Sequence, residues 1–259
     1  MNAASLAAPS PDKPSASISM DAPWRWLSAG WRDFLSVPLI SFGYGLGVVA
    51  GGVLIIAALW SAGYTALIPV ALGVFALVGP ILAVGLYEIS RRLAAGEPIT
   101  LKDVMFVKTK SPVQIAYIGF FLMFAGLVWV RIAMLLYALF ASASYQPLGD
   151  FMGFALSSTA GLSMLAVGTV IGGGIALAIY MLTVISIPML TDRETDLFTA
   201  IMSGVNAVRE NPAPMLLWAW LIGIISAAGV ATFFVGLAVA FPVLGHASWH
   251  AYKDIMGGA

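Results

Sequence analysis

Two histidines are the residues of this chain most suited to binding a metal ion. His246 and His250 are its only histidines, and they lie four residues apart, so a helix would place both on one face. Imidazoles in this arrangement can bind one metal ion or serve as axial haem ligands. Two ligands do not complete a site, however, and Trp249, Tyr252 and Lys253 beside them are typical of a membrane-interface belt. The sequence therefore favours such a belt, with a metal or haem site as the alternative, and predicts no bound cofactor.

Arg131 is the one charge clearly inside a long apolar segment. Bases buried in lipid are costly and usually face the bundle interior or water. If the helix starts near residue 113, Arg131 lies about 27 Å along it, close to the outer headgroups that an arginine can reach. We interpret Arg131 as a structural anchor, with a functional cation site as the alternative and Asp150 as a candidate partner.

Glu88 is a candidate proton or ion ligand, but its neighbours favour a simpler role. Arg91 and Arg92 follow it by three and four residues, the spacing of local ion pairs on a helix. The chain contains no cysteine, which excludes disulfides, thiolate nucleophiles and Cys-ligated metals. No serine lies beside a histidine in a nucleophilic arrangement. We therefore expect that the protein is not an enzyme.

The bulk composition indicates a protein embedded in a membrane. Of 259 residues, 61% are hydrophobic and 9% charged, against about 25% charged in soluble domains. Five uncharged runs hold 175 residues: 34–87, 111–130, 132–149, 151–191 and 211–252. Since about 20 apolar residues cross a bilayer, several of these runs can span it. The net charge is zero, so we expect a lipid bilayer, and other membrane-protein subunits, rather than nucleic acid as partners.

These runs predict an all-α membrane protein with six transmembrane helices. Residues 1–20, rich in Ala, Ser and Pro, are typical of a disordered cytoplasmic tail and do not resemble a signal peptide. Residues 21–259 form a single membrane domain that begins with a tryptophan-rich interfacial helix over 21–36. The predicted spans cover about 38–60, 66–89, 113–138, 163–190, 214–231 and 233–252.

The positions of the basic residues set the orientation and the span count. With six spans, 11 Lys and Arg residues fall on one side and none on the other, and Arg131 stays inside a span. This asymmetry predicts that both termini lie on the cytoplasmic side of a bacterial inner membrane. Five spans would put Lys253 outside and require one helix of more than 35 residues.

A threefold repeat follows from the same layout. Each even span contains one proline: Pro80, Pro188 and Pro242. Each odd span is preceded by an amphipathic segment on the cytoplasmic side that ends at a proline, namely Pro38, Pro112 or Pro212. The pattern predicts three related helix–hairpin units, whose proline bends could line a central cavity. Glycines such as Gly43, Gly47, Gly51 and Gly168 favour close helix approach.

Three motifs resemble those of a domain-of-unknown-function family of bacterial integral membrane proteins. They are GLYEISRR at 85–92, PMLTDR at 188–193 and GHASWHAYKD at 245–254. The resemblance extends from Trp24 to Asp254 and implies a membrane topology without an established activity. Some members carry the label cytochrome c oxidase subunit I. This chain does not support that label, because it is too short and has two histidines where an oxidase core needs six.

Three functional classes are compatible with these features. A scaffold, assembly or accessory subunit is favoured, because spans with few ionisable groups lack the residues that pumps need. A channel or small-solute transporter is the alternative suggested by the proline-bent units. A subunit of a redox complex that uses His246 and His250 is the third.

Overall fold

The computed structural model of the chain describes residues 18–141 and 148–257, and these residues form helices and connecting turns without a strand. Most of the predicted tail, residues 1–17, lies outside the described part. The elements in chain order are α1 (Ala22–Ser36), α2 (Pro38–Ser61), the 3-10 turn η1 (Thr65–Leu67), α3 (Ile68–Leu82), α4 (Val84–Ala95), α5 (Leu101–Met105), α6 (Pro112–Phe140), α7 (Leu148–Ser157), α8 (Thr159–Thr183), α9 (Ser186–Asp192), α10 (Leu197–Glu210), α11 (Pro212–Ala231) and α12 (Leu237–Ile255). The prediction of an all-α fold is confirmed for this part of the chain.

Five stretches of the described chain are long and apolar enough to cross a membrane, rather than the six predicted. They are Pro38–Ser61, Thr65–Ala95, Pro112–Phe140, Thr159–Asp192 and Pro212–Ala231. The predicted sixth span, 233–252, corresponds to α12, which is not among them. The physical reason is its second half, where His246, His250 and Lys253 interrupt the apolar sequence.

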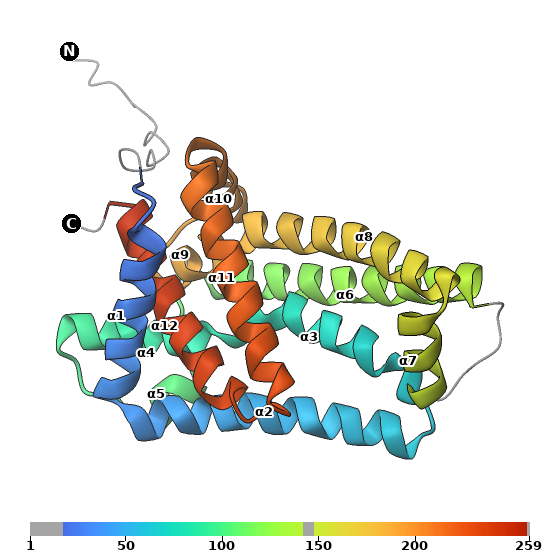
Figure 1. Cartoon of the computed structure of the whole chain (residues 1–259). Helices are drawn as coiled ribbons and strands as arrows, with labels where there is room; N and C mark the ends of the chain where they lie inside the picture. The colour runs from blue at the N-terminus through green and yellow to red at the C-terminus, as the bar shows by residue number, and fades with distance from the viewer. Residues whose placement is uncertain (1–17, 142–147, 258–259) are drawn as a thin grey trace, which may run out of the picture.

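The helices follow two main directions (Figure 1). Helices α2, α3, α6 and α8 run roughly along a common axis, whereas α1, α11 and α12 cross it. At one end of this axis lie α1, α4, α5 and α9 with the C-terminus, and α7 lies at the other end beside the turn between α2 and α3. Charged residues are concentrated in the elements of the first end, which we call the packed end.

The three prolines that precede long helices share one backbone geometry. The residues before them have φ/ψ of −136°/59° at Val37, −127°/65° at Ser111 and −129°/58° at Asn211. A residue that precedes proline is sterically kept out of the helical region, and proline itself is well suited to the first turn of a helix. Each proline therefore starts a long helix, and at Pro38 and Pro212 the preceding helix ends two residues earlier, which makes a sharp corner.

The three prolines inside the returning helices act differently from one another. The helix that contains Pro188 breaks at Val184 and Ile185, where the proline ring would clash with the carbonyl four residues earlier. The break near Pro80 comes later, at Ala83. Helix α12 continues without a break through Pro242. The pattern predicted three equivalent bends, and the structure shows two breaks at different offsets from the proline and one continuous helix.

The main core lies at the packed end, where α4, α9, α11 and α12 contribute most of its fully buried side chains. A second, smaller cluster of Leu136, Ala155 and Met164 lies under α7 at the far end. Between these two clusters the helix faces are largely exposed, as expected for surfaces that lipid covers.

Candidate functional site

The packed end brings together α4, α9 and α12. Helix α4 packs against both α9 and α12, and α1 packs along α12. The space between them is filled by apolar side chains with no exposed surface: Leu86, Ile89, Ile187, Leu190 and Ala247. The helices that contain or follow Pro80, Pro188 and Pro242 thus meet in a packed core at this end, and the polar groups are arranged around that core.

One polar network connects four helices through the two histidines. His246 Nε2 lies 3.0 Å from Ser41 Oγ, and its Nδ1 lies 2.8 Å from Ser90 Oγ. Ser90 Oγ donates to Asp33 Oδ2 at 2.6 Å, and His250 Nε2 lies 2.8 Å from the same oxygen. These residues belong to α1, α2, α4 and α12, so one chain of hydrogen bonds holds four helices together. We call these five residues the histidine network.

The hydrogen-bond partners assign the protons of this network. Ser90 has one hydroxyl proton, which it donates to Asp33, so its oxygen must accept from His246 Nδ1. With Nδ1 protonated, the neutral ring of His246 accepts at Nε2 from the hydroxyl of Ser41. The resulting order is Ser41 to His246 to Ser90 to Asp33. Every polar atom of His246 therefore has a partner in the chain.

Burial controls the charge states of the two central groups. His246 has no exposed surface, and desolvation lowers its pKa below the ordinary value of 6.5, which keeps the ring neutral. Burial alone would raise the pKa of Asp33, but hydrogen bonds from His250 and Ser90 outweigh it, and the pKa lies below the usual 3.8. The network therefore pairs a neutral imidazole with an ionised carboxylate.

The two histidines do not converge on a common ligand position. His246 uses both ring nitrogens on Ser41 and Ser90, and His250 directs Nε2 at Asp33. Among the described residues, no group of three or more His, Cys, Asp or Glu side chains could hold a metal ion. His246 is buried inside the packed end and does not form part of an interfacial belt, because its neighbours on α2 and α4 enclose it.

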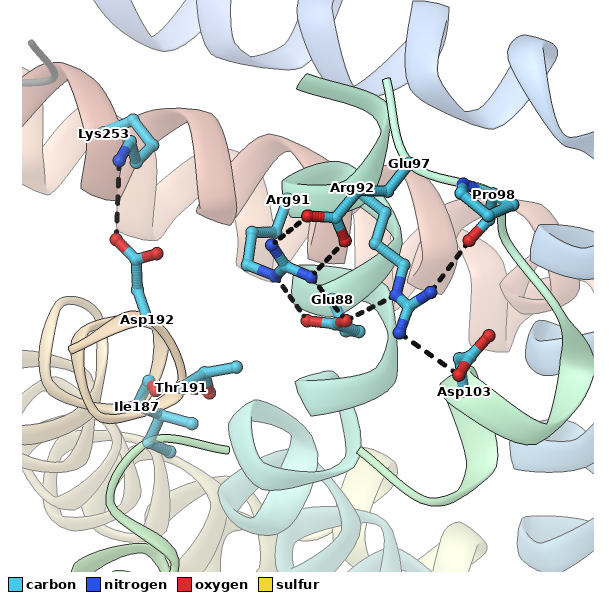
Figure 2. Close-up of polar contacts among 10 residues, drawn as sticks. All are labelled: Glu88, Arg91, Arg92, Glu97, Pro98, Asp103, Ile187, Thr191, Asp192 and Lys253. Carbon is cyan, nitrogen blue, oxygen red and sulfur yellow. Dashed lines mark hydrogen bonds and ion pairs between the residues drawn. The ribbon is translucent and has the colours of Figure 1, made fainter. Parts of the chain in front are cut away.

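Glu88 is the centre of an ion cluster on the outside of α4 (Figure 2). Its oxygens accept from Arg91 at 2.7 Å and 2.9 Å and from Arg92 at 2.6 Å, as the spacing predicts. Arg91 also pairs with Glu97 at 2.8 Å, and Arg92 pairs with Asp103 of α5 at 3.1 Å. Glu88 is 7% exposed, so its charge is balanced where water is largely excluded. The cluster joins α4 to α5 beside a cleft of about 270 Å³.

A third polar contact joins α9 to α12. Tyr252 donates its hydroxyl to Asp192 Oδ2 at 2.8 Å. Lys253 Nζ lies 3.4 Å from the same oxygen, a contact that Figure 2 shows. Lys253 also lies 5.8 Å from the ring centroids of Trp249 and Tyr252. Tyr252 and Lys253, which follow the histidines in sequence, thus connect α12 to α9.

The two remaining candidate charges do not meet. Arg131 and Asp150 are both exposed, and they form no ion pair with each other in the described structure. Arg131 lies on α6 far from the packed end, and Asp150 lies in the first turn of α7. The predicted partnership is therefore not formed.

Sequence reasoning missed Asp33, Ser41 and Ser90 as parts of a site. Asp33 was assigned to the polar face of the interfacial helix, and serines in apolar helices are common. The available signal was a carboxylate and a serine placed next to the proline corner at residue 38, together with a serine inside the GLYEISRR motif.

Comparison with known proteins supports the family resemblance and identifies no activity. Residues 67–192 match a family described as "Predicted integral membrane protein (DUF2189)". This range contains the motif at 85–92 and all but the last residue of the motif at 188–193, whereas the motif at 245–254 lies outside it, so the match is narrower than the predicted resemblance. No curated protein and no solved structure matches the chain.

Proposed function

Because residues 67–192 place this chain among the DUF2189 predicted integral membrane proteins, we propose that it acts as a membrane scaffold, assembly factor or accessory subunit. The observation that carries the proposal is the packed end, where apolar side chains fill the space between α4, α9 and α12. A transporter would need polar groups free to bind a solute there. The histidine network and the Glu88 cluster instead satisfy their polar groups within the chain.

The exposed face of α2 supports lateral association with another membrane protein. Gly43, Gly47 and Gly51 lie one helical turn apart, and a Cβ at each would meet no atom within 4 Å. Glycines at this spacing allow two helix backbones to approach closely in a membrane. Within the described chain no helix packs against this face of α2. The proposal therefore assigns the close helix approach predicted from these glycines to a partner protein.

The repeat and the orientation belong to the same proposal. Three units, each a corner proline, a long helix and a returning helix, are supported by the matching backbone angles at Val37, Ser111 and Asn211. Both termini on the cytoplasmic side of a bacterial inner membrane are supported by the 11 basic residues that a six-span layout places on one side, and beyond the five apolar spans this orientation requires α12 to return the chain to that side. The proposal assigns the chain no catalytic step.

Two measurements on the full-length protein test this function. The first is solute and ion flux in liposomes that contain the purified chain, which we expect to equal that of empty vesicles. The second is co-purification from native membranes in mild detergent, compared between the wild type, Gly47→Leu and Gly223→Leu. Gly223 lies on α11 and is also in open space, so it is the matched control.

We expect Gly47→Leu to lose a co-purifying membrane protein that the wild type and Gly223→Leu retain. Flux above the level of empty vesicles would contradict the scaffold proposal directly. Equal recovery of the same partners with all three proteins would show that α2 is not the contact face.

A further inference from the structure

A pocket of about 750 Å³ lies between α3, α6 and α8, away from the packed end. All three helices belong to stretches long and apolar enough to cross a membrane. Small side chains hollow it out, among them Ala76 of α3, Ala133 of α6, and Gly168 and Ala176 of α8. Its volume falls within the range of about 300–1,000 Å³ that is typical of sites for one small ligand.

Trp129 forms a fixed wall of this pocket. Its indole Nε1 donates to the carbonyl of Val70 at 3.1 Å. A Cβ at Gly73 would lie 2.4 Å from that nitrogen, and a Cβ at Gly172 would lie 2.9 Å from the ring. The ring therefore occupies space that only these two glycines leave open, and its polar group is already satisfied. What Trp129 can offer a ligand is apolar surface.

Helix α7 covers the pocket at the far end of the molecule. Phe151 of α7 lines the pocket and lies 5.8 Å from the ring of Tyr137 on α6. Figure 1 shows α7 across the far ends of the long helices. The exposed helix faces on either side are those that lipid chains surround in a membrane, so a hydrophobic chain can approach the pocket from the side.

The lining selects for hydrocarbon. Among the described residues that line the pocket, none is charged, and the side-chain hydroxyls are those of Tyr137 and Thr169. A ligand segment that fills such a site must itself be uncharged and apolar, because an unpaired polar group would lose its hydrogen bonds to water there. A lipid acyl chain meets this requirement.

Arg131 supplies a positive charge next to a residue that lines the pocket. It is exposed on α6, three residues before Met134, which lines the pocket, so the two side chains are neighbours on the helix surface. A guanidinium within a membrane-spanning stretch is stabilised by an anionic partner, and its two-pronged geometry suits a phosphate. Asp150 does not fill this role. We propose that the pocket holds one acyl chain of an anionic membrane phospholipid whose phosphate pairs with Arg131.

Lipid retention by the purified full-length chain tests both halves of this assignment. Native mass spectrometry after delipidation and titration compares dioleoyl phosphatidylglycerol with dioleoylglycerol, which has the same chains without phosphate. Arg131→Gln should weaken retention of the phosphatidylglycerol about tenfold and leave that of dioleoylglycerol unchanged. Ala176→Phe, which fills the pocket, should weaken retention of both lipids. Ala57→Phe makes the same change on an exposed face of α2 and should alter neither.

Two results would overturn the proposal. Equal retention by Ala176→Phe and Ala57→Phe would show that the lipid binds outside the pocket. Unchanged preference for phosphatidylglycerol in Arg131→Gln would show that the phosphate does not pair with this residue.

A second measurement holds even if Ala176→Phe does not fold. Phosphatidylglycerol with brominated chains, added at low ratio to the protein in detergent, should quench Trp129. The signal is the difference in fluorescence between the wild type and Trp129→Phe. If the brominated phosphatidylglycerol binds but does not reduce the Trp129 fluorescence, the acyl chain does not lie in the pocket.

Discussion

At the packed end, Leu86 and Leu190 have no exposed surface, whereas Leu139 and Leu156 at the far end are 69% and 61% exposed. The same side chain is thus used as core at one end and as surface at the other. At the packed end the helices are held by burial and by polar networks that connect α1, α2, α4, α9 and α12. At the far end they enclose a pocket and leave their faces to lipid. The stability of the fold should therefore depend on the packed end.

Helix α2 shows both situations within a few residues. A Cβ at Gly45 would lie 2.1 Å from the carbonyl oxygen of Ala238 on α12, but a Cβ at Gly43 would meet nothing within 4 Å. One side of α2 is fitted to the chain and the other is open. Comparing matched substitutions on the two sides separates packing within the protein from contacts with lipid or a partner.

The largest difference is expected between two leucines. Leu86→Ala removes a side chain without exposed surface from the main core and should lower the free energy of unfolding by about 2–5 kcal/mol. Leu54→Ala, on the exposed face of α2 at 69% exposure, should change it by less than about 0.5 kcal/mol. Unfolding of both variants in detergent, followed by circular dichroism, measures the difference. Equal losses would show that the two regions do not differ in packing.

The next effect compares the glycines of α2. Gly45→Ala forces a methyl group against the backbone of α12 and should cost about 3 kcal/mol, near the upper end for overpacking. Gly43→Ala has open space and should be neutral or stabilise the helix by up to about 1 kcal/mol. Thermal unfolding of the two purified variants decides between them. A Gly45→Ala protein as stable as the wild type would contradict the close approach of α2 and α12.

A smaller loss is expected from the histidine network. Ser90→Ala removes the hydroxyl that joins His246 to Asp33 and takes away the oxygen that accepts the Nδ1 proton of a buried ring. We expect a loss of about 2 kcal/mol. Ser61→Ala is the control, because the Ser61 hydroxyl is exposed and donates to the carbonyl of Ala58 in its own helix. If both variants unfold at the same temperature, the network does not stabilise the packed end.

The sequence predicted the local features of this fold and missed the distant ones. Helix starts at Pro38, Pro112 and Pro212 could be predicted because proline acts on its immediate neighbours, and the Glu88 pairs because they lie within one helical turn. The histidine network joins residues that are 57, 156, 205 and 217 positions apart. Periodicity indicates which face of a helix a residue occupies, but not which helix packs there. The same limit applies to α12, because its sequence did not indicate that the histidines of its second half contact α1, α2 and α4.

The last effect requires no substitution, only a lower pH. Burial lowers the pKa of His246 in the folded protein. Below pH 6.5 the histidine of the unfolded chain is therefore protonated while that of the folded chain stays neutral. The free energy of unfolding should decrease as the pH falls from 6.5 toward the lowered pKa. Asp33 has a lowered pKa as well, and for a carboxylate the stability it contributes is lost only as the pH falls below 3.8. Other carboxylates with a lowered pKa, such as Asp103 and Asp196, share the second window. In unfolding experiments at several pH values, Asp33→Asn should keep the first decline and reduce the second. A free energy of unfolding of the wild type that does not change from pH 7 to pH 4 would mean that burial at the packed end does not keep His246 neutral. The two ends would then differ in packing but not in their effect on the charge of a buried group.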